Sequence, residues 1–283
     1  MRIKTFGAKH FTSQLPRIEE GFKELNHEIV NENADLIYSN DPTGFDDALK
    51  EKGVKIFNVL DIPEHLFPNY DLKKLDDQLM QATHITCISH TTKKQLKRFF
   101  NIRATAIKII YQPAMPVFQI NEKKYGYKYL MIGRNSDLNK RNWLALQYLQ
   151  LYDSLNKCAA LGNESPYMDV VDWYGIQPIN VLNDFYNSVD YVFSLTKYGG
   201  IELSQIEAIL AGKFPIVAND SQVAMEFNPE FACNPTPEGI HQKILEIEAN
   251  PLKYKEIVAN KQLDFFSKFD RIEVAKRIIG LIV

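Results

Sequence analysis

Two clusters in the second half of the sequence contain residue types suited to binding a phosphate group. In the first, Gly133 and Arg134 follow an apolar run, and Lys140 and Arg141 come a few residues later, where a helical pattern begins. Cations beside the free amides of a helix start are a good site for a phosphate. A solvated basic turn would contain the same residues, so this pattern alone leaves both interpretations open.

The second cluster lies in the stretch 198–217. Gly199 and Gly200 follow the apolar run 191–195 and permit a sharp turn that a side chain would obstruct. Residues 201–211 then read as a helix, and 214–218 as a short apolar strand. This order predicts a βαβ unit with a tight turn at the carboxyl end of its first strand, where ligands bind in open α/β sheets.

The predicted helix 201–211 has two carboxylates on its apolar side. At 100° per residue, Glu202 and Glu207 fall on the packed arc, and Ser204, Gln205 and Ala208 lie opposite. The packed arc consists of Leu203, Ile206, Ile209, Leu210 and Ala211. A buried carboxylate needs hydrogen-bond donors. The hydroxyls of a sugar or ribose would supply them, and so would core arginines or nearby amides.

Two further strand ends lie in the first half of the chain. Asp61 follows the apolar run 54–60, and Ser89 and His90 follow the run 84–88. An aspartate shortly before a proline, as Asp61 is, often forms a turn. A histidine at a strand end is more often a capping or packed residue than a catalytic one.

The elements that must position these residues alternate regularly. Strand and helix patterns alternate from residue 1 to 111, and 112–127 break the rhythm with prolines and charges before the alternation restarts at 128. Alternation of this kind is typical of a parallel sheet covered on both faces. We therefore predict an α/β protein of two Rossmann-like domains, 1–118 and 119–283, facing each other across a cleft.

Composition excludes several classes of protein. The 283 residues are 45% hydrophobic and 24% charged, as in a globular protein, and the net charge of −2 gives no global case for nucleic-acid binding. The three cysteines are scattered without metal spacing, and no apolar run approaches the length of a membrane span. We expect a monomeric cytoplasmic protein that contacts no membrane and has no metal site.

The motifs in order resemble the retaining glycosyltransferases of the GT-B fold. The resemblance rests on Gly133-Arg134 with Lys140, then Tyr174-Gly175, then Gly199-Gly200, and finally the run EAILAGKFPIV from Glu207 to Val217. It implies an enzyme that transfers a sugar from a UDP-sugar and requires no cofactor. It implies donor binding by Gly7, Arg134, Lys140, Gly199, Gly200, Glu202, Leu203 and Glu207. Glu207 would bind the ribose and Glu202 the sugar, while Arg134 and Lys140 would hold the diphosphate.

One branch of that family is more similar: the DNA α-glucosyltransferases of T-even-like bacteriophages. The wider family usually spaces its two glutamates eight residues apart, whereas that branch has the five-residue spacing of Glu202 and Glu207. Further similarities lie at 1–3, 26–29, 88–90, 111–115, 132–134 and 162–166. The implied acceptor is 5-hydroxymethylcytosine in double-stranded DNA, and the implied location is the cytoplasm of an infected host.

Leu60 departs from that branch. Its members have a His-Asp pair after the strand that corresponds to 54–60, and here Leu60 precedes Asp61. In many retaining GT-B enzymes that histidine contacts the donor sugar. Its loss predicts an altered sugar pocket for a different or smaller sugar, such as the pentose arabinose. Glucose remains the alternative donor sugar.

The roles that the resemblance implies leave alternatives open. The catalytic set is Asp61, Arg134, Lys140 and Glu202, with Asp61 orienting the acceptor in a retaining reaction or acting as a base in an inverting one. Phosphates of a DNA acceptor would meet Lys9, His10, Arg17, Lys93, Lys94, Lys97 and Arg98. A polysaccharide, lipid or small-molecule acceptor is the alternative within the family, and a non-catalytic binding protein is the alternative outside it.

Overall fold

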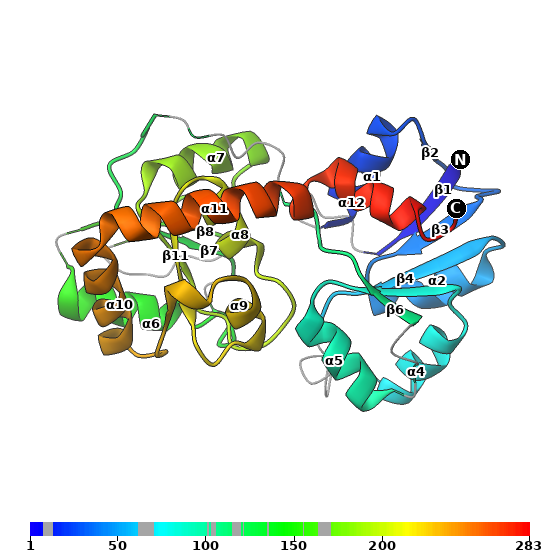
Figure 1. Ribbon diagram of the computed structural model, residues 1–283, viewed down its shortest axis with the longest axis horizontal. Helices are drawn as coiled ribbons and strands as arrows, with labels where there is room; N and C mark the ends of the chain where they lie inside the picture. Colours follow the sequence, from blue (N-terminus) through cyan, green and yellow to red (C-terminus); the bar gives the residue numbers. More distant parts are fainter. Residues whose placement is uncertain are drawn as a thin grey trace. The chain divides into compact units, whose positions relative to one another are not determined.

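The computed structural model describes residues 1–7, 14–61, 71–100, 102, 106–114, 120, 122–134, 136–154, 156–163 and 171–283. It contains two compact units, each with its own sheet (Figure 1). The first unit comprises Met1–Ala114, Gly199–Ile201 and Ser267–Val283, and the second comprises Met115–Tyr198 and Glu202–Phe266. Residues 267–283 thus pack with the first unit, although the strand and helix pattern predicted them in the second domain, 119–283.

The sheet of the first unit is parallel, in the order β2-β1-β3-β4-β5-β6. Its strands are β1 (Arg2–Phe6), β2 (Glu28–Ile29), β3 (Leu36–Ser39), β4 (Val54–Val59), β5 (His84–Cys87) and β6 (Ile107–Ile109). The chain leaves β1 in one direction to β2 and then crosses to β3 on the other side. Its topological switch point therefore lies between β1 and β3.

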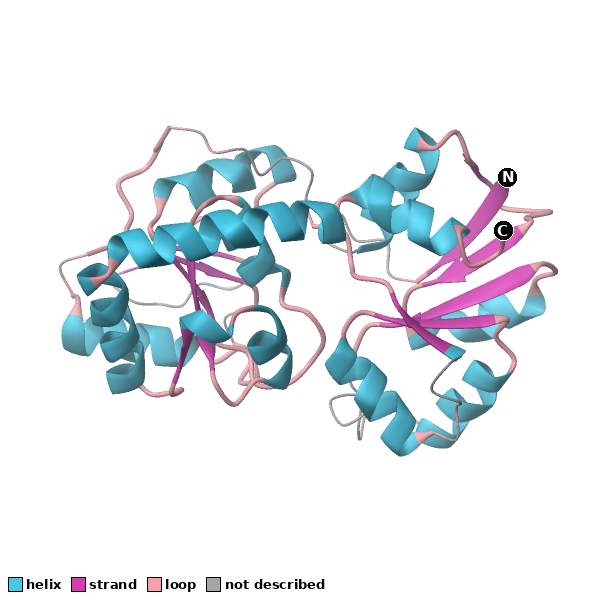
Figure 2. Ribbon diagram, viewed as in Figure 1, coloured by secondary structure: helices cyan, strands magenta, loops and turns pink. Residues whose placement is uncertain are grey.

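Helices cover both faces of this sheet (Figure 2). They are α1 (Gln14–Glu24), α2 (Phe45–Lys50), α4 (Leu72–Met80), α5 (His90–Phe99) and α12 (Arg271–Ile279). Alternate residues of β3 point to opposite faces. Leu36 and Tyr38 join one buried cluster with α1 and α12, while Ile37 joins the other with α2, α4 and α5. The predicted two-sided burial of a parallel sheet is confirmed here.

The sheet of the second unit is also parallel, in the order β12-β11-β10-β7-β8-β9. Its strands are β7 (Tyr129–Ile132), β8 (Cys158–Leu161), β9 (Val171–Trp173), β10 (Tyr191–Ser194), β11 (Phe214–Ala218) and β12 (Ala232–Cys233). The order runs outward from β7 to β9 and returns to β10 on the other side of β7, as in a Rossmann sheet. The switch point lies between β7 and β10.

The helices of the second unit include one that the sequence placed incorrectly. They are α6 (Asn142–Tyr152), α7 (Ile179–Ser188), α8 (Leu203–Leu210), α9 (Gln222–Phe227), α10 (Pro237–Ala249) and α11 (Pro251–Phe269), which runs on into the first unit. The predicted helix 201–211 is α8, which begins only at Leu203, so Glu202 is its N-cap and lies on no helix face.

The predicted polar face of α8 is also wrong, because residues 204–210 are all buried. Ser204 pairs with Ser194 through their hydroxyls at 3.1 Å, and Gln205 accepts a hydrogen bond of 2.9 Å from Asn228. Partners far away in sequence therefore satisfy the polar side chains that the helical wheel assigned to the outer side. Across the described residues, every helix is too short or too polar to cross a membrane.

Gly21 permits the close contact between α1 and α12. A Cβ atom at Gly21 would lie 2.4 Å from the carbonyl oxygen of Arg271. We predict that Gly21→Ala lowers the free energy of unfolding by about 1–2 kcal/mol, because the clash outweighs the better helix propensity of alanine. Gly126→Ala is the matched control, since nothing lies within 4 Å of its added Cβ. Urea unfolding measures both, and a Gly21→Ala protein as stable as the control would contradict the prediction.

Candidate functional site

Glycines occupy the carboxyl ends of three neighbouring strands of the second unit. A Cβ atom at Gly162 would lie 1.8 Å from the carbonyl oxygen of Gly133, and both residues have positive φ angles, 147° and 127°. Gly162 donates a backbone hydrogen bond of 3.0 Å to Gly175, which follows β9. Only glycine fits this approach of β7 and β8. The edge of the sheet therefore presents bare backbone where Rossmann sheets bind their ligands.

Arg134 and Lys140 lie in the loop that follows β7, beside the switch point. Arg134 forms an ion pair of 2.7 Å with Asp137, and the Arg134 side chain is 63% exposed. Lys140 forms an ion pair with Glu202, and both of these side chains are about four-fifths buried. The Lys140 stem also lies alongside Gly133. The structure thus brings the predicted pair Lys140 and Glu202 together, and it gives each predicted cation a carboxylate partner.

Glu207 is buried, as the helical wheel predicted, and it has a hydrogen-bond donor. Tyr186, a fully buried residue of α7, donates its hydroxyl hydrogen to Glu207 Oε2 at 2.9 Å. Glu202, five residues earlier, caps α8 without a side-chain hydrogen bond to the helix. A carboxylate at a helix N-terminus is favoured by the helix dipole. The two glutamates therefore occupy different environments, although the sequence placed them on one helix face.

The glycine turn lies against the end of β4 within the first unit. Gly200 donates its backbone N–H to Asp61 Oδ1 at 2.9 Å, and a Cβ at Gly200 would lie 2.0 Å from the carbonyl oxygen of Leu60. Gly199 has a φ of 124°, a conformation that favours glycine. The structure therefore brings together three residues of the predicted site, Asp61, Gly199 and Gly200.

Gly7 lies at the switch point of the first unit. A Cβ there would lie 1.9 Å from Asn40 Oδ1, at the end of β3, so the position excludes larger residues. Lys9 and His10 fall outside the described residues. Arg17, predicted to meet DNA phosphates, is only 5% exposed and donates to the carbonyl oxygen of Pro113 at 3.2 Å. That placement is a correction: packing of α1 against residue 113 puts Arg17 in the interior.

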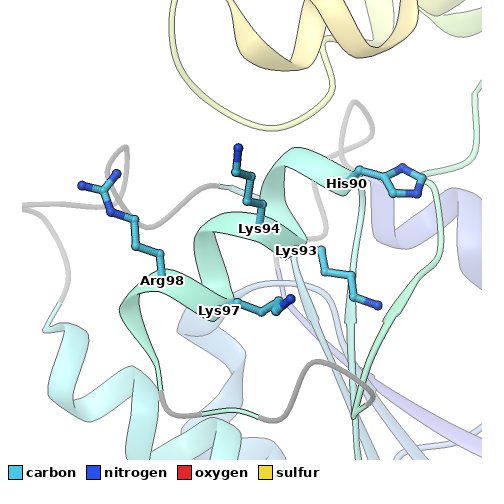
Figure 3. Close-up of a pocket in the computed structure, with 5 residues that line it drawn as sticks. All are labelled: His90, Lys93, Lys94, Lys97 and Arg98. Carbon is cyan, nitrogen blue, oxygen red and sulfur yellow. The ribbon is translucent and has the colours of Figure 1, made fainter.

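The remaining cations of the predicted DNA surface lie together on α5. A shallow hollow in the surface is lined by His90, Lys93, Lys94, Lys97 and Arg98 (Figure 3). Lys94, Lys97 and Arg98 are exposed, and α5 contains no acidic residue. Ser89 caps the helix by accepting a hydrogen bond of 2.9 Å from the Thr92 amide. Ser89 therefore has the capping role that a strand-end serine commonly has.

Several contacts at these strand ends had no signal in the sequence. Tyr186 and Asp137 look like ordinary helix and loop residues, yet they pair with Glu207 and Arg134. Arg141 is left-handed at a φ of 54° and forms a bidentate pair with Asp220, at 2.8 and 2.7 Å. The Arg141 guanidinium holds the pKa of the Asp220 carboxyl below its usual range.

Among the described residues, no three His, Cys, Asp or Glu side chains form a metal-binding group.

Solved structures share this fold over the whole chain, although no family model and no curated protein matches it. Anabaena HepE in complex with UDP-glucose is 15% identical with a TM-score of 0.78, covering 100% of this chain and 99% of its own. A glycosyltransferase from Rickettsia africae is 13% identical with a TM-score of 0.72, covering 99% and 97%. An α-glucosyltransferase, AGT, in complex with UDP is 11% identical with a TM-score of 0.70, covering 100% and 99%. The chain has the two-sheet α/β fold of these glycosyltransferases.

The hydrogen bond from Tyr186 to Glu207 yields a prediction about stability. Removing a hydrogen bond to a charged group costs about 1.5–3 kcal/mol, compared with about 0.5–1.5 kcal/mol for a neutral pair. Tyr186→Phe should therefore destabilise the protein more than Tyr148→Phe, whose buried hydroxyl bonds the Tyr129 hydroxyl at 2.9 Å. Chemical unfolding of the two variants measures the difference. Equal losses would show that Glu207 does not depend on Tyr186.

Proposed function

We propose that this protein transfers a sugar from a UDP-sugar to 5-hydroxymethylcytosine in double-stranded DNA, with retention of configuration. The observation that carries the donor half is the loop at the switch point of the second unit, where Arg134 and Lys140 follow bare glycine backbone. The fold shared with structures that contain UDP and UDP-glucose supports the same assignment.

Arg134 and Lys140 would bind the donor diphosphate. The Arg134 side chain is 63% exposed in its ion pair with Asp137, whose own side chain is 22% exposed. Ion pairs that water reaches contribute only about 0–1 kcal/mol, so a diphosphate can replace Asp137 as the partner of Arg134. Lys140 has three N–H donors and can contact a phosphate oxygen while it keeps Glu202. Together the two cations stabilise the negative charge that grows on the leaving diphosphate.

The reaction that we propose needs only the donor and the acceptor, with no oxidant, reductant or third substrate. The bond between the sugar C1 and the diphosphate oxygen breaks, and a bond forms between C1 and the acceptor hydroxyl oxygen on the same face. The hydroxyl proton passes to the departing diphosphate oxygen. Asp61 orients the acceptor hydroxyl or stabilises the positive charge on the ring, and the hydrogen bond that it accepts from the Gly200 N–H fixes its carboxylate. Glu207 binds the ribose.

The DNA half of the proposal is supported by α5. Its exposed cations Lys94, Lys97 and Arg98 form a local positive surface on a chain whose net charge is −2. Phosphate contacts of this kind supply affinity without reading sequence. Reaching the cytosine also requires flipping it out of the stack. The resemblance of several sequence segments to phage DNA α-glucosyltransferases points to the same acceptor.

We predict transfer to hydroxymethylated duplex DNA from at least one UDP-sugar. Incubation with UDP-glucose, UDP-arabinose and UDP-xylose, read by mass spectrometry of the nucleosides, identifies the sugar. A pentose preference would fit Leu60, which stands where related enzymes have a histidine, and a strong preference for glucose would remove that idea. Transfer only to a polysaccharide, lipid or small molecule would reject DNA, and an absence of both transfer and UDP-sugar hydrolysis would reject an enzyme.

Arg134→Ala should lower the rate of transfer at least about tenfold, because one charge-assisted hydrogen bond is worth about 1.5–3 kcal/mol. Arg277→Ala is a matched control, since Arg277 lies in α12 and donates to the carbonyl oxygen of Ser267 at 3.1 Å. Turnover is measured by release of UDP. Near-normal turnover by Arg134→Ala would remove the diphosphate assignment.

The α5 surface yields a separate prediction about salt. Replacing Lys94 and Lys97 by alanine should lower the magnitude of the slope of log K against log salt concentration by about 2, because two phosphate contacts are lost. The matched control is Lys253→Ala with Lys255→Ala, two exposed lysines of α11. Gel shifts with hydroxymethylated duplex at several salt concentrations measure the slope, and affinity for UDP should not change. Equal slopes for the two double variants would contradict an α5 contact with DNA.

A further inference from the structure

Three consecutive residues of the loop after β7 attach it to two other loops of the second unit, the one between β10 and α8 and the one after β11. Asn139 bonds to Lys197 and Tyr198 after β10, Lys140 pairs with Glu202 at the start of α8, and Arg141 pairs with Asp220 after β11. The first two attachments fall immediately before and immediately after the segment 199–201. Adjacent residues of one loop therefore hold both ends of the glycine turn.

The Asn139 contacts form a compact set of hydrogen bonds to the backbone. Its side-chain oxygen accepts from the Tyr198 N–H at 2.9 Å, and its side-chain nitrogen donates to the Tyr198 carbonyl oxygen at 2.8 Å. Its own carbonyl oxygen accepts from the Lys197 N–H at 3.0 Å. Within its loop, the backbone N–H of Asn139 donates a hydrogen bond of 2.9 Å to Asp137 Oδ1. Asn139 thus pairs with both backbone groups of Tyr198, much as a neighbouring strand would.

Stability alone gives little reason for this arrangement. The two bonds from the Asn139 side chain are exposed to solvent, so water can replace them when they break. Their effect on geometry is larger, because Gly199 and Gly200 follow directly and glycine has more backbone freedom than any other residue. An unheld turn of two glycines would have to be ordered when a ligand binds, which reduces affinity.

We propose that Asn139 is a positioning residue that fixes Tyr198, the residue before the glycine turn, and through its own loop holds Lys140 in place for the donor diphosphate. This inference rests on the proposed function, since it assumes that the diphosphate binds at Arg134 and Lys140. The two hydrogen bonds between the Asn139 side chain and the Tyr198 backbone involve no charged group. They therefore persist when the diphosphate binds Lys140, and they keep the residue before the turn fixed at that moment.

The test compares the affinities of UDP and UMP for three proteins by calorimetry: the wild type, Asn139→Ala and Asn250→Ala. Asn250 is the matched control, because its exposed side chain also donates one hydrogen bond to a backbone carbonyl, that of Glu246 at 3.0 Å. We expect Asn139→Ala to weaken UDP about tenfold and UMP much less, because loss of preorganisation affects the second phosphate most. A general loosening of the unit would weaken both nucleotides alike, and that result would overturn the proposal.

Turnover and melting temperature complete the experiment. We expect the kcat of Asn139→Ala to fall about tenfold while its melting temperature stays within about 3 °C of the wild type. Asn139→Gln, which keeps the amide, should recover part of the loss even if Asn139→Ala folds poorly. Unchanged UDP affinity and turnover in Asn139→Ala would reject the positioning role. A wild type that binds no UDP would instead reject the proposed function.

Discussion

The ion pair of Lys140 with Glu202 determines how the switch point of the second unit is arranged. It joins the loop after β7 to the first turn of α8, and both side chains are about four-fifths buried. Each charge would be costly at that depth without the other. The start of α8 adds its dipole, which favours the carboxylate of Glu202. The pair therefore keeps a cation at the sheet edge, and the position of that cation depends on where α8 begins.

Close backbone contacts between the ends of β7 and β8 help to position this ion pair. Gly162 approaches Gly133 so closely that a Cβ would overlap the carbonyl oxygen, and the stem of Lys140 passes alongside Gly133. A larger residue at Gly162 would push the end of β7 away and displace the loop that begins there. The cation and the glycines are therefore one constraint: the loop can place Lys140 beside Glu202 only because the strand ends have no side chains.

The alternation of strands and helices predicted the α/β fold, because most of its elements are long enough to show their period. It did not predict β8, a strand of only four residues, CAAL, most of which have small side chains. It also missed the two-residue strands β2 and β12. The buried surroundings of Ser204 and Gln205 were missed for a different reason. A helical wheel records which residues are apolar, while Ser194 and Asn228, which pair with them, come from other elements. Arg17 and Asn139 illustrate the same limit, since their partners lie 96 and 59 residues away.

Donor and acceptor chemistry depend on different physical terms in this chain. Affinity for a diphosphate at Arg134 and Lys140 comes from a few short, directional contacts at the edge of the second sheet, which salt weakens only moderately. Affinity of α5 for a polyanion would come from released counterions and would fall steeply with salt. Because the net charge of the chain is −2, the attraction of a polyanion would come from the cations of α5 and not from the surface as a whole. A protein could therefore keep its donor chemistry and change its acceptor by altering one exposed helix, and the identity of the acceptor must be established independently of the donor.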